Sequence, residues 1–236
     1  LNVAEMRIAD DEDQKRISEF VKSAPLPPEK MLEEVYAYTA KIRSSEIRNI
    51  VMAILDKKED RLLYWPAAKS LHHSIRGGLL YHMVRMLRTA EAISNVYEGI
   101  NTDLLFAGVI IHDMSKIGEL EANEIGMADY TKEGKLLGHI IMGVEEIDRA
   151  ARETGASEEV TLLLKHMVVS HHYEPEFGSP KKPAFPEAEL LHHIDMIDAR
   201  VYDYQNATKD LEPGSFSDPV WSLDRRSIYK PDLEGT

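Results

Sequence analysis

Side chains that could bind a metal ion recur at five places along this chain. Two of the places are adjacent pairs and the other three are single residues. The chain has ten histidines and no cysteine, so imidazole nitrogen and carboxylate oxygen are the ligands available to a metal. The five places, in chain order, are His82, His112-Asp113, His139, His171-His172 and Asp195.

Each of these places lies within or directly after an apolar stretch with helical spacing. His112-Asp113 follows the apolar run 104–111, and His171-His172 follow the segment 160–170. Taken alone, such a histidine is more often a satisfied core residue or a helix cap than a ligand. Taken together, five helices each bring an imidazole or a carboxylate into an apolar setting, where an unpaired polar group costs free energy. The sequence therefore predicts that the five places meet at a shared metal centre.

The remaining pattern predicts an all-α fold of about seven helices. Helical spacing marks the segments 29–42, 45–58, 78–96, 104–111, 133–151, 160–170 and 187–208. Two glycines and mixed polarity over 118–131 indicate a short hairpin. We expect Ser45 and Asp103 to cap helix N-termini, and Gly99 to end the helix before it.

The composition fits one domain with a short leading segment. The 236 residues are 43% hydrophobic, which is enough for one sizeable core. Pro25, Pro27 and Pro28 form a rigid linker, so we expect a tail and linker over 1–27 and a single domain over 28–236. No apolar run reaches membrane-spanning length and no signal-peptide pattern opens the chain. We therefore expect a soluble cytoplasmic protein without membrane contact.

The formal net charge of −13 argues against a broad surface for nucleic acid, which would need an excess of lysine and arginine. It does not argue against a local basic groove. A cluster of carboxylates and histidines also becomes less negative once it binds a metal.

Longer blocks around the candidate ligands carry a family resemblance. The blocks are HHSIRGGLLYH at 72–82, AGVIIHDMSK at 107–116, YTKEGKLLGH at 130–139, LKHMVVSHH at 164–172 and SLDRR at 222–226. The order of a histidine, a His-Asp pair and a distant aspartate resembles the HD-domain superfamily of metal-dependent phosphohydrolases. The full set of blocks, over roughly residues 24–230, is similar to the YhaM-type 3′→5′ exoribonucleases.

The resemblance implies an HD-domain helical bundle that holds two divalent metal ions. The implied ligands of the first ion are His82, His112, Asp113 and Asp195. The implied ligands of the second ion are His139 and His171, with Asp113 as a bridge and His172 as an extra ligand. Mn, Fe, Co or Mg would each suit oxygen and imidazole ligands.

The implied activity is that of a metal-dependent phosphodiesterase, a 3′→5′ exonuclease on single-stranded RNA or DNA. Two metal ions can hold a hydroxide, clamp a phosphate and stabilise both the attacking and the leaving oxygen. We therefore expect in-line attack of a metal-bound hydroxide on phosphorus, with Asp113 and Lys116 as the catalytic residues. Lys116 would also bind the substrate phosphate as a point charge, unless it is a solvated surface lysine.

Further residues could contact the substrate. His73 and Arg76 lead into the helix of His82 and could touch the phosphate or the 3′ end, or could merely anchor a loop. The proline-rich loop 173–186 contains Phe177 and two lysines, Lys181 and Lys182, and could add a stacking ring and charge. The remaining histidines of the helices are expected to pack or to orient the ligands: His166, His192 and His193.

Two features depart from the family pattern. The exoribonucleases in question normally carry an N-terminal OB-type barrel, and only residues 1–9 could be its final strand. The segment 1–27 could therefore be a remnant of such a domain. Met114-Ser115 stands where the family more often has an apolar residue and a glycine; because serine is small, we expect the turn to survive.

Three other hypotheses stay open at this stage. The absent barrel and the acidic charge favour a phosphohydrolase for small nucleotides. A di-iron oxygenase is the second, because some HD-fold proteins use this ligand set with O₂. A non-catalytic module is the third, although the complete ligand set argues against it. The sequence also leaves open RNA or DNA as the substrate, and whether the protein is a homo-oligomer.

Overall fold

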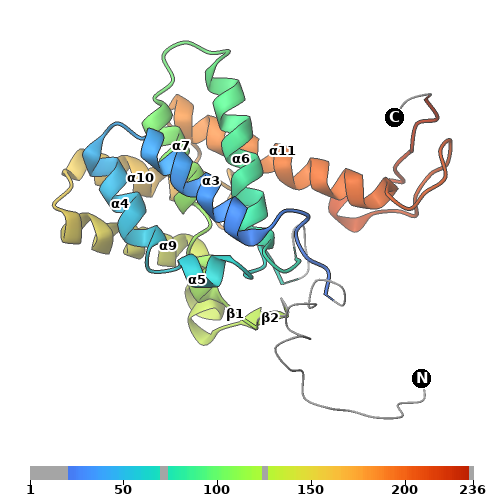
Figure 1. The fold of residues 1–236 in the computed structure, drawn as a ribbon, viewed down its shortest axis with the longest axis horizontal. Helices are drawn as coiled ribbons and strands as arrows, with labels where there is room; N and C mark the ends of the chain where they lie inside the picture. The colour runs from blue at the N-terminus through green and yellow to red at the C-terminus, as the bar shows by residue number, and fades with distance from the viewer. Residues whose placement is uncertain (1–20, 70–73, 124–126, 234–236) are drawn as a thin grey trace.

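The computed structural model describes residues 21–69, 74–123 and 127–233 (Figure 1). The chain is mostly helical, and the described residues contain one two-stranded sheet. The prediction of an all-α fold is therefore confirmed. The expected tail lies mostly outside the described residues, and the boundary between residues 27 and 28 stays a prediction.

Two helices from the N-terminal third cover one side of the core. Helix α3 (Pro28–Lys41) begins with a proline, which needs no backbone hydrogen bond at that position, and buries Met31 and Val35 one turn apart. Helix α4 (Ser45–Leu55) is capped by Ser44, whose hydroxyl accepts from the backbone N–H of Ile47, and not by Ser45 as predicted. The short helix α5 (Glu59–Leu62) follows.

The central pair of helices is α6 (Gly78–Ser94) and α7 (Thr102–Ile111), which pack against each other. Helix α6 ends before the predicted stop at Gly99. The cap of α7 is Asn101 and not Asp103 as predicted. Asp103 instead accepts from the backbone N–H groups of Arg43 and Ser44, at 3.0 and 2.8 Å, and so joins α7 to the start of α4.

The predicted hairpin is present between α7 and the next long helix. A short helix, α8 (Lys116–Glu119), leads into strand β1 (Leu120–Ala122), which pairs antiparallel with β2 (Ala128–Tyr130). Helix α9 (Lys132–Thr154) then returns along the core and is interrupted at Gly138. It ends before Gly155, which has a positive φ of 70°.

The last third of the chain completes the bundle. Helix α10 (Glu158–Ser170) is capped by Ser157, whose hydroxyl accepts from the backbone N–H of Val160, and a one-turn helix, η1 (Pro175–Phe177), lies in the loop that follows. Helix α11 (Pro186–Thr208) packs on α6 and α7 and then extends beyond the bundle (Figure 1). The short helix η2 (Trp221–Leu223) packs on α11.

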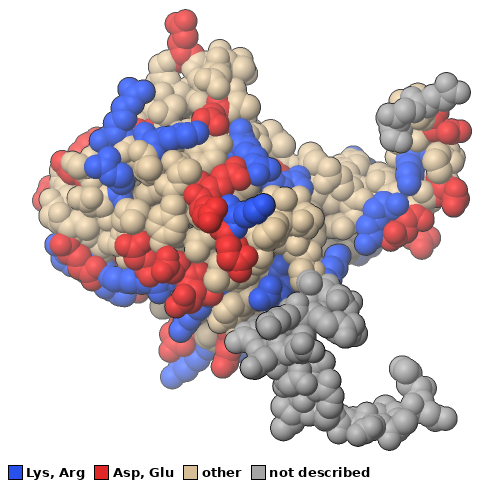
Figure 2. Space-filling view, viewed as in Figure 1, with Lys and Arg blue, Asp and Glu red and all other residues tan. Residues whose placement is uncertain are grey.

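One hydrophobic core joins these elements, with buried residues from α3 through α11. Figure 2 shows acidic and basic side chains interleaved over one face of the bundle. Within the described part of the chain, none of the helices has both the length and the apolar character that crossing a membrane requires.

Candidate metal centre

The seven candidate ligands come from five elements that the core holds in place. His82 projects from α6, His112 and Asp113 directly follow α7, and Asp195 lies on α11. The other three residues are His139 on α9, and His171 and His172 directly after α10. Figure 1 shows these helices gathered in one bundle, so residues more than 100 positions apart in the sequence come into one cluster.

The carboxylate of Asp113 lies between two groups of imidazoles. Its Oδ2 atom is 3.3 Å from Nε2 of His112 and 3.9 Å from Nε2 of His82. Its Oδ1 atom is 3.5 Å from Nε2 of His139 and 3.9 Å from Nε2 of His171. Each oxygen of one carboxylate therefore faces a different group, as a bridge between two ions requires.

The two groups are compact enough for metal binding. Ligand-type atoms of His82, His112 and Asp113 lie within 4.8 Å of one another, and so do those of a second set. The second set is His139, His171 and His172. Asp195 joins the first group, because its Oδ1 atom is 3.2 Å from Nε2 of His82. Metal–ligand bonds of about 2.1 Å place neighbouring ligand atoms roughly 3.0–3.4 Å apart, and the shorter of these contacts fall in that range.

The second nitrogen of each imidazole is already engaged by the protein. Nδ1 of His112 donates to the carbonyl oxygen of Val109 at 2.8 Å, and Nδ1 of His171 donates to that of Val168 at 2.7 Å. Because a carbonyl only accepts, these rings carry their proton on Nδ1 and present Nε2 as a lone pair. The Nδ1 atoms of the other three rings are hydrogen-bonded as well. The partners are the carboxylate of Asp198 for His82, the carboxylate of Glu119 for His139 and the carbonyl of Phe177 for His172. This is how metal-binding histidines are usually oriented.

Several buried atoms of the cluster have no hydrogen-bond partner within the described ranges. They are Nε2 of His112, His139 and His171, and Oδ1 of Asp113. Buried polar atoms are rarely left in this state, because their desolvation is not compensated. A pair of divalent cations between these atoms would satisfy all of them, so the residues present fit such ions.

The charges of the cluster favour the forms that bind metal. Burial opposes ionisation of Asp113, but the ammonium of Lys116 outweighs it and holds the pKa of Asp113 well below the usual range. Burial, reinforced by the neighbouring His172, lowers the pKa of His171 well below its usual value, so that ring is neutral. His82 differs: burial opposes its charge, but hydrogen bonds to Asp195 and Asp198 raise its pKa to about 10. A metal ion would displace that proton.

A kink in α9 aims His139 at the centre. Gly138 has φ 72° and ψ 160°, a backbone conformation that other residues avoid, and it turns the helix immediately before His139. A second glycine, Gly134, lets α9 approach the preceding short helix, because a Cβ there would lie 2.1 Å from the carbonyl oxygen of Glu119. The close approach brings the side chain of Glu119 to His139.

The expected turn after Asp113 is present, although serine stands where the family more often has glycine. Ser115 is buried, and its hydroxyl donates to Glu146 at 2.8 Å. Glu146 in turn forms an ion pair of 2.5 Å with Lys58, whose ammonium also donates to the carbonyl of Met114. A polar network therefore braces the turn that carries the metal-facing carboxylate.

Comparison with known proteins identifies the family. An HD-domain family model matches residues 79–200, which include all seven candidate ligands. This chain belongs to the HD-domain family. A curated relative from Geobacillus sp. (strain WCH70), named 3′-5′ exoribonuclease YhaM, is 42% identical over 231 residues, which are 98% of this chain and 71% of the relative. A relative of the same name from Halalkalibacterium halodurans is 42% identical over 235 residues, 99% of this chain and 72% of its own length. No solved structure matches the chain.

Of the predicted substrate-binding residues of this HD-domain protein, the structure places Lys116 at the cluster. Lys116 belongs to the cluster, because its Nζ atom lies 2.8 Å from Oδ2 of Asp113 and is largely buried. The main chain of Arg76 pairs with the segment around Ser23, through bonds to Lys22 and Ala24. His73 lies outside the described residues.

The other histidines of the HD domain support the centre from outside. Nδ1 of His192 donates to the carbonyl oxygen of His171 at 2.8 Å, and Nε2 of His166 accepts from the backbone N–H of Ala184 at 3.0 Å. His193 is exposed and contacts Glu189 on its own helix. His192 therefore holds the backbone of the candidate pair His171-His172, and His166 holds the end of the loop that follows it. Both contacts are in line with the expected packing role.

Two orienting carboxylates were not predicted. Asp198 accepts from Nδ1 of His82 at 2.7 Å and also pairs with Arg85 at 2.5 Å. Its position three residues after Asp195, on the same helix face, was a usable signal. Glu119 gave no such signal, because it lies in a segment of mixed polarity without a helical pattern.

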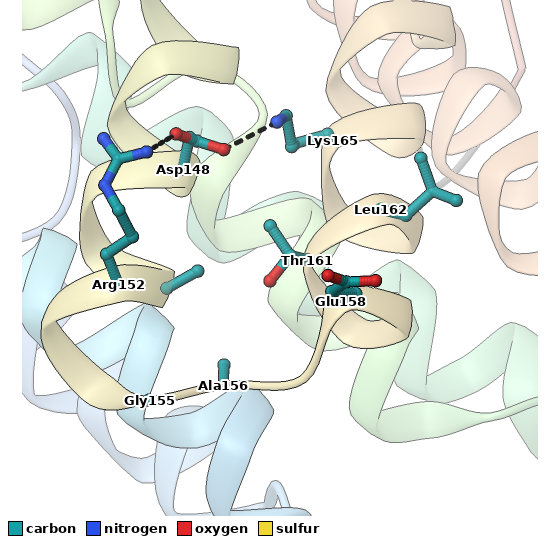
Figure 3. A pocket seen from close by; sticks show the side chains of 9 residues that line it. Asp148, Arg152, Gly155, Ala156, Glu158, Thr161, Leu162 and Lys165 are labelled. Carbon is teal, nitrogen blue, oxygen red and sulfur yellow. Dashed lines mark hydrogen bonds and ion pairs between the residues drawn. The ribbon is translucent and has the colours of Figure 1, made fainter.

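One hollow lined by described residues is separate from this centre (Figure 3). It has a volume of about 500 Å³ and lies between the end of α9 and the start of α10. Its central carboxylate, Asp148, pairs with both Arg152 and Lys165. None of the candidate ligands lines it. The described groups of histidines and carboxylates that could hold a metal lie elsewhere.

Proposed function

We propose that this HD-domain protein is a metal-dependent 3′→5′ exonuclease that cleaves phosphodiester bonds in single-stranded RNA. The observation that carries the proposal is the position of Asp113, whose two oxygens face two separate groups of imidazoles. The two curated relatives, both named 3′-5′ exoribonuclease YhaM, support the direction of attack and the choice of RNA.

The proposal assigns ligands to two divalent ions. The ligands of one ion would be His82, His112, Asp113 and Asp195. Those of the other would be His139, His171 and His172, with Asp113 shared. Two such ions supply Lewis acidity at phosphorus and lower the pKa of a bound water. The imidazole-rich set favours Mn, Fe or Co over Mg, which prefers oxygen ligands.

The chain's own residues would prepare the centre for the reaction. Asp198 and Glu119 keep the rings of His82 and His139 oriented through their Nδ1 atoms. Lys116 lies 2.8 Å from Asp113, on the more exposed side of the cluster. From there its ammonium could bind a non-bridging oxygen of the substrate phosphate and offset the charge that develops in the transition state.

An exonuclease assay with defined metals tests the proposal. The protein would be stripped with a chelator, reloaded with Mn, Fe, Co or Mg, and given single-stranded RNA labelled at its 3′ end. We expect labelled mononucleotide as the first product with at least one metal, and none after chelation. Wild-type protein that releases no mononucleotide with any of the four metals would contradict the proposal.

Variants make the assay specific for this centre. His112→Ala and Asp113→Ala should abolish cleavage, because each removes a ligand from the first group. Asp148→Ala is the matched control, since Asp148 is a paired carboxylate in the separate hollow. Single-stranded DNA of the same sequence, run in parallel, measures the preference for RNA. The relatives do not favour the alternatives of a small-nucleotide phosphohydrolase or a di-iron oxygenase.

A further inference from the structure

The side chains of the cluster differ in their exposure to solvent. The side chains of His82 and His112 are each 1% exposed, and that of His171 is fully buried. The side chains of Lys116 and Asp195 are 12% and 13% exposed. The side chain of His139 is 11% exposed. A substrate would reach the centre past these more exposed residues.

The loop after His172 begins beside His139, one of these more exposed residues. The ring of His172 lies 5.3 Å from that of His139. Its Nδ1 atom donates to the backbone carbonyl of Phe177 at 2.6 Å, and its backbone N–H donates to the hydroxyl of Ser179 at 3.0 Å. Phe177 thus lies one hydrogen bond away from a candidate ligand.

The loop holds Phe177 in a fixed position but leaves its side chain exposed. The backbone N–H of Phe177 donates to the carbonyl of Glu174, and that of the next residue, Gly178, donates to the carbonyl of Pro175. The side chain of Phe177 is nevertheless 70% exposed. Within the described part of the chain, Phe177 has no aromatic partner. An exposed ring without an aromatic partner, on a residue whose backbone is bonded to a candidate ligand, is suited to stacking.

The chemistry of a single-stranded nucleotide matches this arrangement. Its phosphate is charged and would be held at the metal centre, whereas its base is a flat ring with an apolar face. Stacking on an aromatic side chain binds any of the four bases. The nearby Lys182 is engaged by Glu174 at 3.3 Å and by the ring of Tyr173, so it braces the loop.

We propose that Phe177 is a stacking platform for one of the two bases that flank the scissile phosphate. The inference rests on the proposed exonuclease function and adds a substrate contact to it. It explains how an acidic protein could hold single-stranded RNA without a broad basic surface. It also makes binding tolerant of sequence, because every base presents a similar face to the ring.

The experiment combines protein variants with RNA that lacks a single base. Phe177→Ala, Phe177→Trp and wild-type protein, all loaded with metal, would be given intact RNA or RNA with an abasic last or penultimate nucleotide. Phe177→Ala should raise KM for intact RNA about 5- to 100-fold, and Phe177→Trp should stay close to wild type. Metal content should not change in either variant, because His172 is held by the backbone carbonyl of Phe177 and not by its ring.

The abasic substrates separate stacking from a structural effect. For wild-type protein, KM should rise by a similar factor on one of the two abasic RNAs. For Phe177→Ala, KM on that RNA should be no higher than on intact RNA. The matched control is Phe216→Ala, which removes another exposed ring, 4.9 Å from Tyr229 in the C-terminal segment, and should leave KM unchanged.

Two results would overturn the inference alone. One is a normal KM for Phe177→Ala on intact RNA. The other is a loss in Phe177→Ala that multiplies with the loss caused by the missing base on both abasic RNAs. Failure of the proposed function looks different, because wild-type protein would then leave intact RNA uncut with every metal, and both proposals would fall.

Discussion

One carboxylate oxygen of Glu119 accepts two hydrogen bonds from His139, one from the backbone N–H at 3.0 Å and one from Nδ1 at 3.1 Å. The backbone bond replaces the helical bond that the kink at Gly138 breaks. The side-chain bond fixes the ring, so that Nε2 points toward Asp113. Glu119 therefore links the shape of α9 to the geometry of the second group of ligands.

We predict that Glu119→Ala weakens metal binding about 10- to 100-fold at one of two sites, because His139 loses its orientation. Glu119→Gln should retain more affinity, since an amide oxygen still accepts both bonds. Calorimetric titration of the stripped protein with Mn²⁺ measures both effects. Glu121→Ala, which removes an exposed carboxylate from the neighbouring strand, is the control. Equal affinities in Glu119→Ala and the control would refute the orienting role.

The shared position of Asp113 predicts different metal contents for two variants. His139→Ala should lose about one ion per chain, because only the second group of ligands is damaged. Asp113→Asn should lose both ions or bind both weakly, because an amide offers neither group a negative oxygen. Elemental analysis after gel filtration gives the ratio directly. Identical metal content in the two variants would argue against a bridging carboxylate.

Lys116 should act on the substrate and not on metal loading. We expect Lys116→Gln to lower kcat/KM for RNA roughly 100-fold while metal content stays at the wild-type level. Lys135→Gln, a change to an exposed lysine on α9, serves as the control. A loss of metal in Lys116→Gln, in proportion to the loss of activity, would instead assign the lysine to the stability of the centre.

The ion pair beneath the Asp113 turn should matter more for stability than a neighbouring surface pair. In Lys58→Met, Glu146 keeps a mostly buried charge without its 2.5 Å partner, which should lower the free energy of unfolding by about 2–4 kcal/mol. Lys57→Met breaks an exposed pair with Glu153 and should cost at most about 1 kcal/mol. Urea unfolding of the chelated proteins compares the two, and similar costs would contradict the prediction.

His166 should make stability depend on pH. Burial lowers its pKa below 6.5, and its Nε2 accepts a hydrogen bond from Ala184 only while the ring is neutral. Below pH 6.5, His166 of the unfolded chain binds a proton, whereas the ring in the folded protein stays neutral until a lower pH. The contribution is therefore complete above pH 6.5 and is lost as the pH falls toward the folded pKa.

The replacement His166→Gln isolates this effect, because an amide oxygen can accept the same bond at any pH. Between about pH 7.5 and about pH 5.5, wild-type protein should lose more unfolding free energy than the variant, in chelated samples measured by urea unfolding. A parallel decline of the two proteins would show that His166 does not contribute to the pH dependence.

Local details of the fold were the least predictable from sequence. The helices that carry the cluster were found because their apolar faces repeat with helical spacing. The caps at Ser44 and Asn101 were missed by one or two residues. Several polar residues lie near the start of each helix, and the path of the backbone decides which of them caps it. The use of Asp103 to join α4 and α7 depends on a contact across about sixty residues, which no local pattern encodes.

The sequence by itself determined the type of ligands, since it contains histidines and carboxylates but no cysteine, and it determined their order along the helices. Only the tertiary structure decided that the two oxygens of Asp113 face different imidazoles, that Asp198 and Glu119 orient two of the rings, and that the backbone carbonyl of Phe177 holds His172. The physical reason is that residue type and helical period are local properties. The direction in which a side chain points depends on how helices pack across the core.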